Sequence, residues 1–145
     1  MSRLSLLTAI VSLFVACESP SDFPAVVTAL TSPTPLRLGE SITITLTNHT
    51  GLPIFVPLCC NSFVYHLDRL ELSGKWVPYG SSDIPCTKEC GKTPPQPVLP
   101  SQSRSDSILY YPIDKDGTYR LRIPYFDEEG SPRMVSTNSI LLEMI

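Results

Sequence analysis

Cysteines and histidines are the side chains with the widest chemistry in this 145-residue chain, which has five of the former and two of the latter. Four cysteines stand in its body: Cys59, Cys60, Cys86 and Cys90. Four thiols can form two disulfides or bind one zinc ion. Cys86 and Cys90 have a spacing common in zinc sites. Cys59 and Cys60 do not, because adjacent residues of an extended chain point to opposite faces, and this favours disulfides. A bond between neighbours would strain the peptide, so we expect Cys59 and Cys60 to be bonded to Cys86 and Cys90, with either connectivity open.

The segment Met1–Cys17 has the pattern of an export signal. Arg3 precedes an uncharged stretch, Leu4–Ala16, that is too short to span a bilayer as a helix and is typical of a secretory signal peptide. Its end, Phe14-Val15-Ala16-Cys17, resembles the lipobox of bacterial lipoproteins. The resemblance implies cleavage before Cys17 and a lipid thioether on its sulfur. The alternative is an ordinary cleaved signal, which would need a small residue where the large Phe14 stands.

These features divide the chain into a signal peptide (1–16), a lipidated tether (17–25) and one folded domain (26–145). The tether is polar and broken by proline, as expected of a linker. Lipid on Cys17 leaves an even set of four thiols, and export to an oxidising compartment makes disulfides the default. We therefore expect a cell-envelope protein anchored to a membrane, with the outer membrane favoured, facing the periplasm or the surface.

Groups that could perform catalysis are few. His66 and Asp68 share one face of a regular strand, where the carboxylate could orient the imidazole as a general base, although a surface pair without chemistry is the simpler interpretation. His49 lies in a turn. The sequence contains no G-x-S-x-G, H-E-x-x-H or glycine-rich phosphate loop. We expect no enzyme, no cofactor and no metal, with a metal carrier using His66 or the thiols as a lesser alternative.

Composition excludes several other classes. The formal net charge is −3 and the basic residues are scattered, so no basic patch predicts nucleic-acid binding. Apolar residues make up 42% of the chain, which argues against disorder. The 15 prolines argue against a helix bundle, because proline blocks helix interiors.

Alternating apolar and polar residues predict strands. The clearest cases are Ser41–Asn48 and Thr118–Tyr125. In the strand expected near Phe63, the apolar phase slips near Asp68, which predicts a β-bulge there. Trp76 follows a turn and is expected to pack on the core. Weaker strand patterns cover Val26–Leu30, Ile54–Leu58, Phe63–Leu72, Ser107–Ile113 and Met134–Ile145.

About seven short strands separated by turns predict an all-β chain, an antiparallel β-sandwich. The segment Gly80–Ser107 contains two cysteines and little periodic hydrophobicity. We expect a long loop there, because that pattern fits neither strand nor helix. Disulfides to Cys59 and Cys60 would brace such a loop.

Two segments resemble immunoglobulin-like domains. Asp116-Gly117-Thr118-Tyr119-Arg120-Leu121 is similar to their tyrosine corner, in which a tyrosine hydroxyl binds the backbone a few residues upstream. Leu38–Asn48 resembles the second strand of bacterial Ig-like modules. The resemblance covers about residues 26–145 and implies an Ig-like sandwich in which Tyr119 is structural. One similar group is the bacterial Ig-like proteinase inhibitors.

The function that these observations favour is a non-catalytic, lipid-anchored envelope protein. Its Ig-like domain would bind a protein or glycan partner, with the braced loop as the first choice of binding surface. An Ig-like protease inhibitor is the alternative, since a braced loop could enter a protease cleft.

Overall fold

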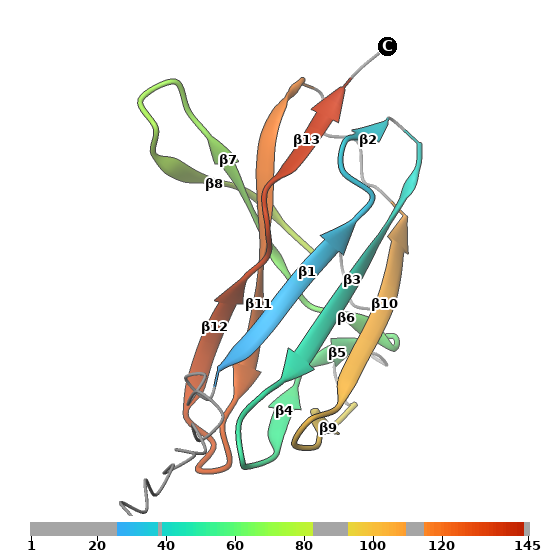
Figure 1. Ribbon diagram of the computed structural model, residues 1–145, viewed down its shortest axis with the longest axis vertical. Coiled ribbons are helices and arrows are strands. Elements are labelled where there is room, and N and C mark those ends of the chain that lie inside the picture. Colours follow the sequence, from blue (N-terminus) through green and yellow to red (C-terminus); the bar gives the residue numbers. More distant parts are fainter. Residues whose placement is uncertain (1–25, 38, 83–92, 110–114, 144–145) are drawn as a thin grey trace, which may run out of the picture.

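The structure, a computed structural model, describes residues 26–37, 39–82, 93–109 and 115–143 (Figure 1). This part of the chain is all-β, as predicted. Its residues include no helix long and apolar enough to cross a membrane. The strands are β1 (Val27–Ser32), β2 (Leu36–Arg37), β3 (Ser41–Asn48), β4 (Ile54–Val56), β5 (Leu58–Cys59), β6 (Ser62–Phe63), β7 (His66–Leu70), β8 (Trp76–Ser81), β9 (Gln96–Val98), β10 (Ser103–Leu109), β11 (Gly117–Phe126), β12 (Pro132–Ser136) and β13 (Ile140–Glu143).

Two main sheets form the layers of a sandwich. The small sheet has the order β1-β3-β10. The large sheet has the order β2-β13-β11-β4-β9, and β11 also pairs with β12 and β7, which in turn pairs with β8. A separate two-stranded piece joins β5 to β6. All strand pairs of the described chain are antiparallel except the short parallel pair β2–β13, so the predicted antiparallel arrangement holds for nearly all of the molecule.

The core lies between the two sheets because the strands alternate. In β3, Ile42, Ile44 and Leu46 are buried and the threonines between them reach the outer face, as the sequence predicts. In β11 the buried side chains are those of Tyr119, Leu121 and Ile123, again as predicted. The other buried apolar side chains are those of Val27, Ala29, Leu36, Ile54, Val56, Leu58, Phe63, Val98, Ile140 and Leu142.

The outer face of the small sheet carries a ladder of hydroxyl groups. Hydroxyl pairs join β3 to β10 at three positions of the register, each two residues from the next. This pairing uses the polar side of the alternation, where short side chains of opposite strands meet. The oxygen–oxygen distances are 3.4 Å for Thr43–Ser107, 2.9 Å for Thr45–Ser105 and 2.8 Å for Thr47–Ser103.

The prediction of one long loop over Gly80–Ser107 is wrong for the described part of that segment. It contains β9, whose Val98 is buried, and the start of β10. β9 cannot be recognised from the sequence, because only three of its residues pair and one of them is Pro97. It hides the start of β10 because serines face out and Arg104 and Asp106 occupy the inner positions. Residues 83–92 lie outside the described chain.

The irregularity predicted near Asp68 is present, but it lies on the partner strand and not on β7 itself: Leu67 pairs with Gly80 and Asp68 with Pro78, so the extra residue is Tyr79 of β8. The pairing of β7 with β8 shifts register between Leu67 and Asp68. The strand β8 itself was not predicted, and its Trp76 is only half-buried and lies outside the core cluster. The expectation that Trp76 packs on the core is therefore wrong, because Arg120 takes up one face of its ring, with its Cζ 4.6 Å from the ring centroid.

The sandwich has two ends. At the proximal end, Val27 at the start of β1 pairs with Asn48, close to the β3–β4 and β11–β12 turns (Figure 1). At the distal end, β11 begins beside the end of β7, where Tyr119 pairs with Arg69, and the β7–β8 hairpin projects from the body. The start of the domain and this hairpin thus lie at opposite ends.

Candidate binding surface at the distal end

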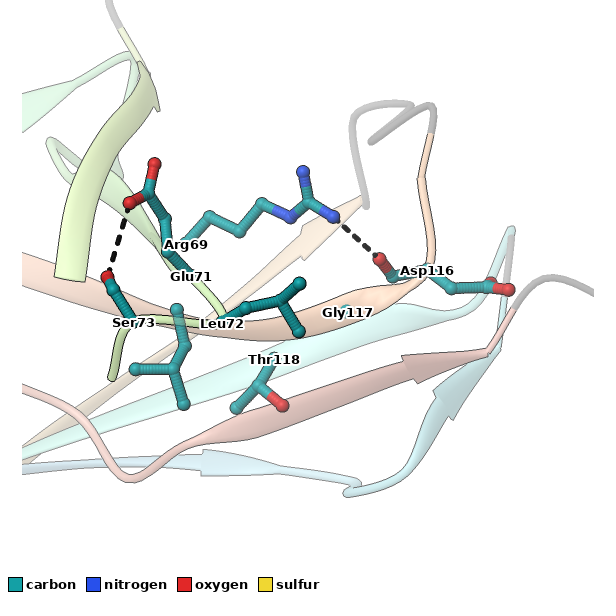
Figure 2. A pocket seen from close by; sticks show the side chains of 8 residues that line it. Arg69, Glu71, Leu72, Ser73, Asp116, Gly117 and Thr118 are labelled. Carbon is teal, nitrogen blue, oxygen red and sulfur yellow. Dashed lines mark hydrogen bonds between the residues drawn. The ribbon is translucent and has the colours of Figure 1, made fainter. Parts of the chain in front are cut away.

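A pocket of about 660 Å³ opens between the β7–β8 hairpin and the start of β11. Its walls come from two segments that are far apart in the sequence but adjacent in the sheet. They mix charged, hydroxyl and apolar groups, as binding sites commonly do. The lining residues are Arg69, Leu70, Glu71, Leu72, Ser73, Asp116, Gly117 and Thr118 (Figure 2).

Arg69 spans this pocket. Its Nη2 donates a hydrogen bond to the carbonyl oxygen of Asp116, at 3.3 Å, and Figure 2 shows the side chain extending from β7 toward that residue. Gly117 allows the close approach, because a Cβ there would lie 3.2 Å from Arg69 Nε. Leu72 at the hairpin tip is fully exposed and supplies apolar area to the pocket wall.

A buried carboxylate holds the base of the hairpin. Asp68 on β7 is only 3% exposed, and its Oδ2 accepts a hydrogen bond from Arg120 Nε on β11 at 3.1 Å. Arg122 Nε lies 2.9 Å from the same oxygen, an ion-pair contact without hydrogen-bond geometry. A buried carboxylate needs such partners, because its desolvation is costly when it is unpaired. We refer to Asp68, Arg120 and Arg122 as the ionic triad.

The triad connects three strands. Asp68 lies on β7, both arginines lie on β11, and the Trp76 ring of β8 packs on Arg120. A cation over an indole face is attracted by the ring quadrupole. This arrangement fixes the hairpin to the sheet that carries the pocket.

The structure does not bring together the candidate general base. His66 and Asp68 face Arg122 and Arg120 of β11, but no hydrogen bond joins the imidazole to the carboxylate in this described region. The carboxylate is instead held by guanidinium groups. The second imidazole, that of His49, contacts the Thr28 hydroxyl at 3.1 Å at the proximal end. Across the described ranges no three His, Cys, Asp or Glu side chains group as metal ligands would.

Tyr119 follows the pocket residue Thr118 in β11 and points into the core. Its side chain is 1% exposed, and its hydroxyl donates a hydrogen bond to the carbonyl oxygen of Lys115 at 2.9 Å. The acceptor lies four residues upstream, where the tyrosine-corner resemblance places it. The Tyr79 ring packs on Tyr119 edge to face, with 5.4 Å between centroids. Tyr119 thus ties the segment before β11 to the core.

The cysteines are only partly within the described chain. Cys59 and Cys60 are disulfide-bonded, and they lie at the end of β5 and in the following turn. Cys86, Cys90 and the candidate lipid-bearing Cys17 lie outside the described residues. The pairing of these cysteines stays a prediction.

Sequence reasoning did not find the ionic triad. The alternation over Thr118–Tyr125 puts Arg120 and Arg122 on the face opposite Tyr119, but the sequence analysis matched Asp68 with His66 on its own strand. The signal that could have identified the triad is the presence of two arginines on one face of β11 opposite a single acidic residue, Asp68, on β7. Using it requires the β7–β11 register, which local sequence does not define.

Comparisons with known proteins give no family. No protein-family model and no curated protein matches the chain. Solved structures that resemble it include a protein assigned as ApaA from Bordetella pertussis, with 16% identity, a TM-score of 0.45 and coverage of 82% of this chain and 90% of that one. The alkylpurine DNA glycosylase AlkC of Pseudomonas fluorescens gives 14% identity, a TM-score of 0.35 and coverage of 81% and 30%. A PapD-like domain of human CEP192 gives 14% identity, a TM-score of 0.33 and coverage of 100% and 98%. Similarity at this level carries no argument about function.

Proposed function

We propose that this chain is a non-catalytic, lipid-anchored protein of the bacterial cell envelope whose β-sandwich binds a protein or glycan partner. The observation that carries the proposal is the placement of the domain start and the β7–β8 hairpin at opposite ends. A nine-residue tether (17–25) reaches at most about 30 Å. A domain held that closely by its proximal end would direct the distal pocket away from the membrane.

We infer that the sandwich is immunoglobulin-like. The small sheet has the order of Ig strands A, B and E, and the large sheet places β4 and β7, β11 and β13 in the order of strands C, F and G. The hydrogen bond of Tyr119 to Lys115 supports the same inference. Leu121 stands where antibody domains have a cysteine, so this domain differs from them in lacking that inter-sheet bond.

We propose that Cys59 and Cys60 are bonded to Cys86 and Cys90 and brace the segment between β8 and β9. The disulfide-bonded state of the first two supports this pairing. Non-reducing peptide mapping of the envelope protein tests it, with both connectivities as supporting results. Free thiols at Cys86 and Cys90, or stoichiometric zinc, would exclude it.

The anchor is tested at Cys17. Mass spectrometry of the mature protein should show an acylated N-terminal cysteine, and Cys17→Ala should release the protein from the membrane fraction. An unmodified N-terminus in the wild-type protein would contradict the lipid anchor.

The distal pocket is tested by partner capture from native envelopes. Leu72→Asp should abolish capture without lowering thermal stability, because the leucine side chain has no burial to lose. Leu30→Asp is the matched control, since Leu30 is 60% exposed on the outer face of the small sheet. Equal capture by both variants would remove the pocket from the proposal. Protease or periodate treatment of the captured material distinguishes a protein from a glycan.

A further inference from the structure

β10 is an open edge strand of the small sheet. Within the described chain it pairs with β3 alone, through an uninterrupted register from Ser103 to Leu109. It is seven residues long and contains neither proline nor a bulge. Such an edge leaves a row of backbone donors and acceptors able to pair with another strand.

The other edges of the two main sheets are closed or blocked. At β1, the backbone N–H of Thr31 donates to Asn138 Oδ1 and its carbonyl accepts from Asn138 Nδ2. Proline stands inside two more edge strands, at Pro78 in β8 and Pro97 in β9, and begins a third, β12, at Pro132, while β2 has only two residues. Proline removes a ladder donor and protects an edge against pairing. Apart from Arg104 and Asp106 at its inner positions, β10 has none of these devices, and such inward charges disfavour any partner strand whose charges do not match them.

The sequence of β10 is complementary to itself in antiparallel pairing. If Ser105 faces Ser105 of a second copy, Ser103 faces Ser107 and Arg104 faces Asp106 across the new edge. Each charge then meets the opposite charge on the same face of the sheet, twice in the symmetric pair. Opposite charges at facing positions stabilise strand pairs, and like charges destabilise them.

The charges needed for this pairing are available. Arg104 makes no hydrogen bond or ion pair with any residue of the described chain, although it is half-buried. Asp106 uses one oxygen, Oδ2, to accept the Phe63 N–H at 2.8 Å. Its other oxygen has no hydrogen-bond partner in the described structure and can accept from an arginine.

We propose that two copies of this chain associate through antiparallel pairing of their β10 strands, centred on Ser105. The two small sheets become one six-stranded sheet, and the hydroxyl ladders of both copies form one continuous outer face. Symmetric pairing of this kind is isologous and closes at two copies. The proposal does not depend on the anchor or on the distal pocket.

Cysteine cross-linking of the full chain in its native membrane tests the pairing and its register. Ser105→Cys places two thiols opposite each other on the symmetry axis, so mild oxidation should give a covalent dimer. Ser103→Cys and Ser107→Cys should not cross-link alone, but should do so when both variants are expressed together. Lys75→Cys, on the distal hairpin, is the control for random collision. Cross-linking of Ser105→Cys no greater than that of Lys75→Cys would overturn the proposal, and efficient cross-linking of Ser103→Cys alone would overturn its register.

Charge reversal tests the complementarity. Adding Arg104→Asp to the Ser105→Cys chain places aspartates opposite each other and should lower the cross-linked fraction about fivefold or more. Lys75→Asp makes the same change of charge at a distance and should leave that fraction unchanged. Coexpression with an Asp106→Arg, Ser105→Cys chain should restore a mixed dimer. A thermal melt shows whether the Asp106 variant folds, and if it does not, the Arg104→Asp comparison decides alone.

Discussion

The two ends of the sandwich are built in different ways. At the proximal end, Asn48 is fully buried and all of its amide groups are used. Its Nδ2 donates to the carbonyl oxygens of Leu52 and Val98, both at 2.8 Å, and its Oδ1 accepts from the N–H and the hydroxyl of Thr50. One side chain thus closes the β3–β4 turn and attaches β9 to it.

At the distal end, polar side chains support a surface that stays open. The Tyr119 hydroxyl and the ionic triad hold β7, β8 and β11 together, but Arg69, Glu71 and Leu72 line a pocket. Asp68 Oδ1 is buried and has no hydrogen-bond partner in the described structure. The two ends therefore differ in how fully their buried polar side chains are satisfied: every amide group of Asn48 has a partner, whereas one oxygen of Asp68 has none in the described structure.

The largest expected effect is at the proximal end. Asn48→Ala removes four hydrogen bonds from a buried turn. The Val98 carbonyl and the Thr50 N–H lose the side-chain partner, while the Leu52 carbonyl keeps the Thr50 hydroxyl, and the free energy of unfolding should fall by about 3 kcal/mol or more. Denaturant unfolding measures it. His49→Ala, in the same turn but exposed, is the control and should cost less than about 1 kcal/mol. Equal losses for the two variants would show that the amide network contributes little.

The distal triad should give the next largest effect. Asp68→Asn removes the charge that both arginines face, and should cost about 2–3 kcal/mol, less than a fully buried pair, because the arginines reach solvent. Denaturant unfolding gives the loss, and limited proteolysis should locate new cleavage in the β7–β8 hairpin. Loss below about 0.5 kcal/mol would mean that solvent screens the triad.

The strands of the small sheet differ in how far the sequence predicts them. Ser41–Asn48 was predicted to the residue because one face is apolar and the other consists of threonines. β10 was found only from Ser107 onward, because its inner positions before that carry Arg104 and Asp106. An alternating pattern identifies a strand in the sequence only where the residues of one face are apolar.

The candidate site was less predictable than the fold. Tyr119 was found because its corner is a local motif of a few residues. Asp68 was assigned the wrong partner, since its real neighbours come from a strand some fifty residues away and depend on register. The pocket is formed by the end of β7 with the following turn and by the start of β11, so no single segment of the sequence contains all of its lining residues.

The tyrosine corner should give an intermediate effect. Tyr119→Phe keeps the packed ring but leaves the Lys115 carbonyl without its donor, and should cost about 1–2 kcal/mol in denaturant unfolding. Tyr125→Phe on the same strand is the control, because the described structure gives that hydroxyl no hydrogen bond. Equal stability of Tyr119→Phe and the wild-type protein would exclude a stabilising corner.

The smallest effect concerns the exposed carboxylate of the β11–β12 turn. The backbone N–H of Ser131 donates to Asp127 Oδ1 at 2.8 Å, and Arg133 Nε lies 3.1 Å from Oδ2. The Ser131 hydrogen bond, followed by Arg133, holds the pKa of Asp127 below its ordinary value of 3.8. The ionised form is favoured in the folded state, so its contribution to stability is present above pH 3.8 and is lost as the pH falls through the lower folded pKa.

NMR titration of the side-chain carboxyl carbon measures this shift directly. Arg133→Gln should raise the pKa of Asp127 only part of the way to its ordinary value, because the larger contribution comes from the backbone of Ser131. Lys75→Gln, at the other end of the molecule, should leave it unchanged, since salt screens charges beyond about 10 Å. A wild-type midpoint at or above 3.8 would contradict the turn geometry. A full return to the ordinary value in Arg133→Gln would instead make the arginine the main cause of the lowered pKa. The carboxylate of the β11–β12 turn would then be stabilised by an exposed ion pair rather than by backbone hydrogen bonds.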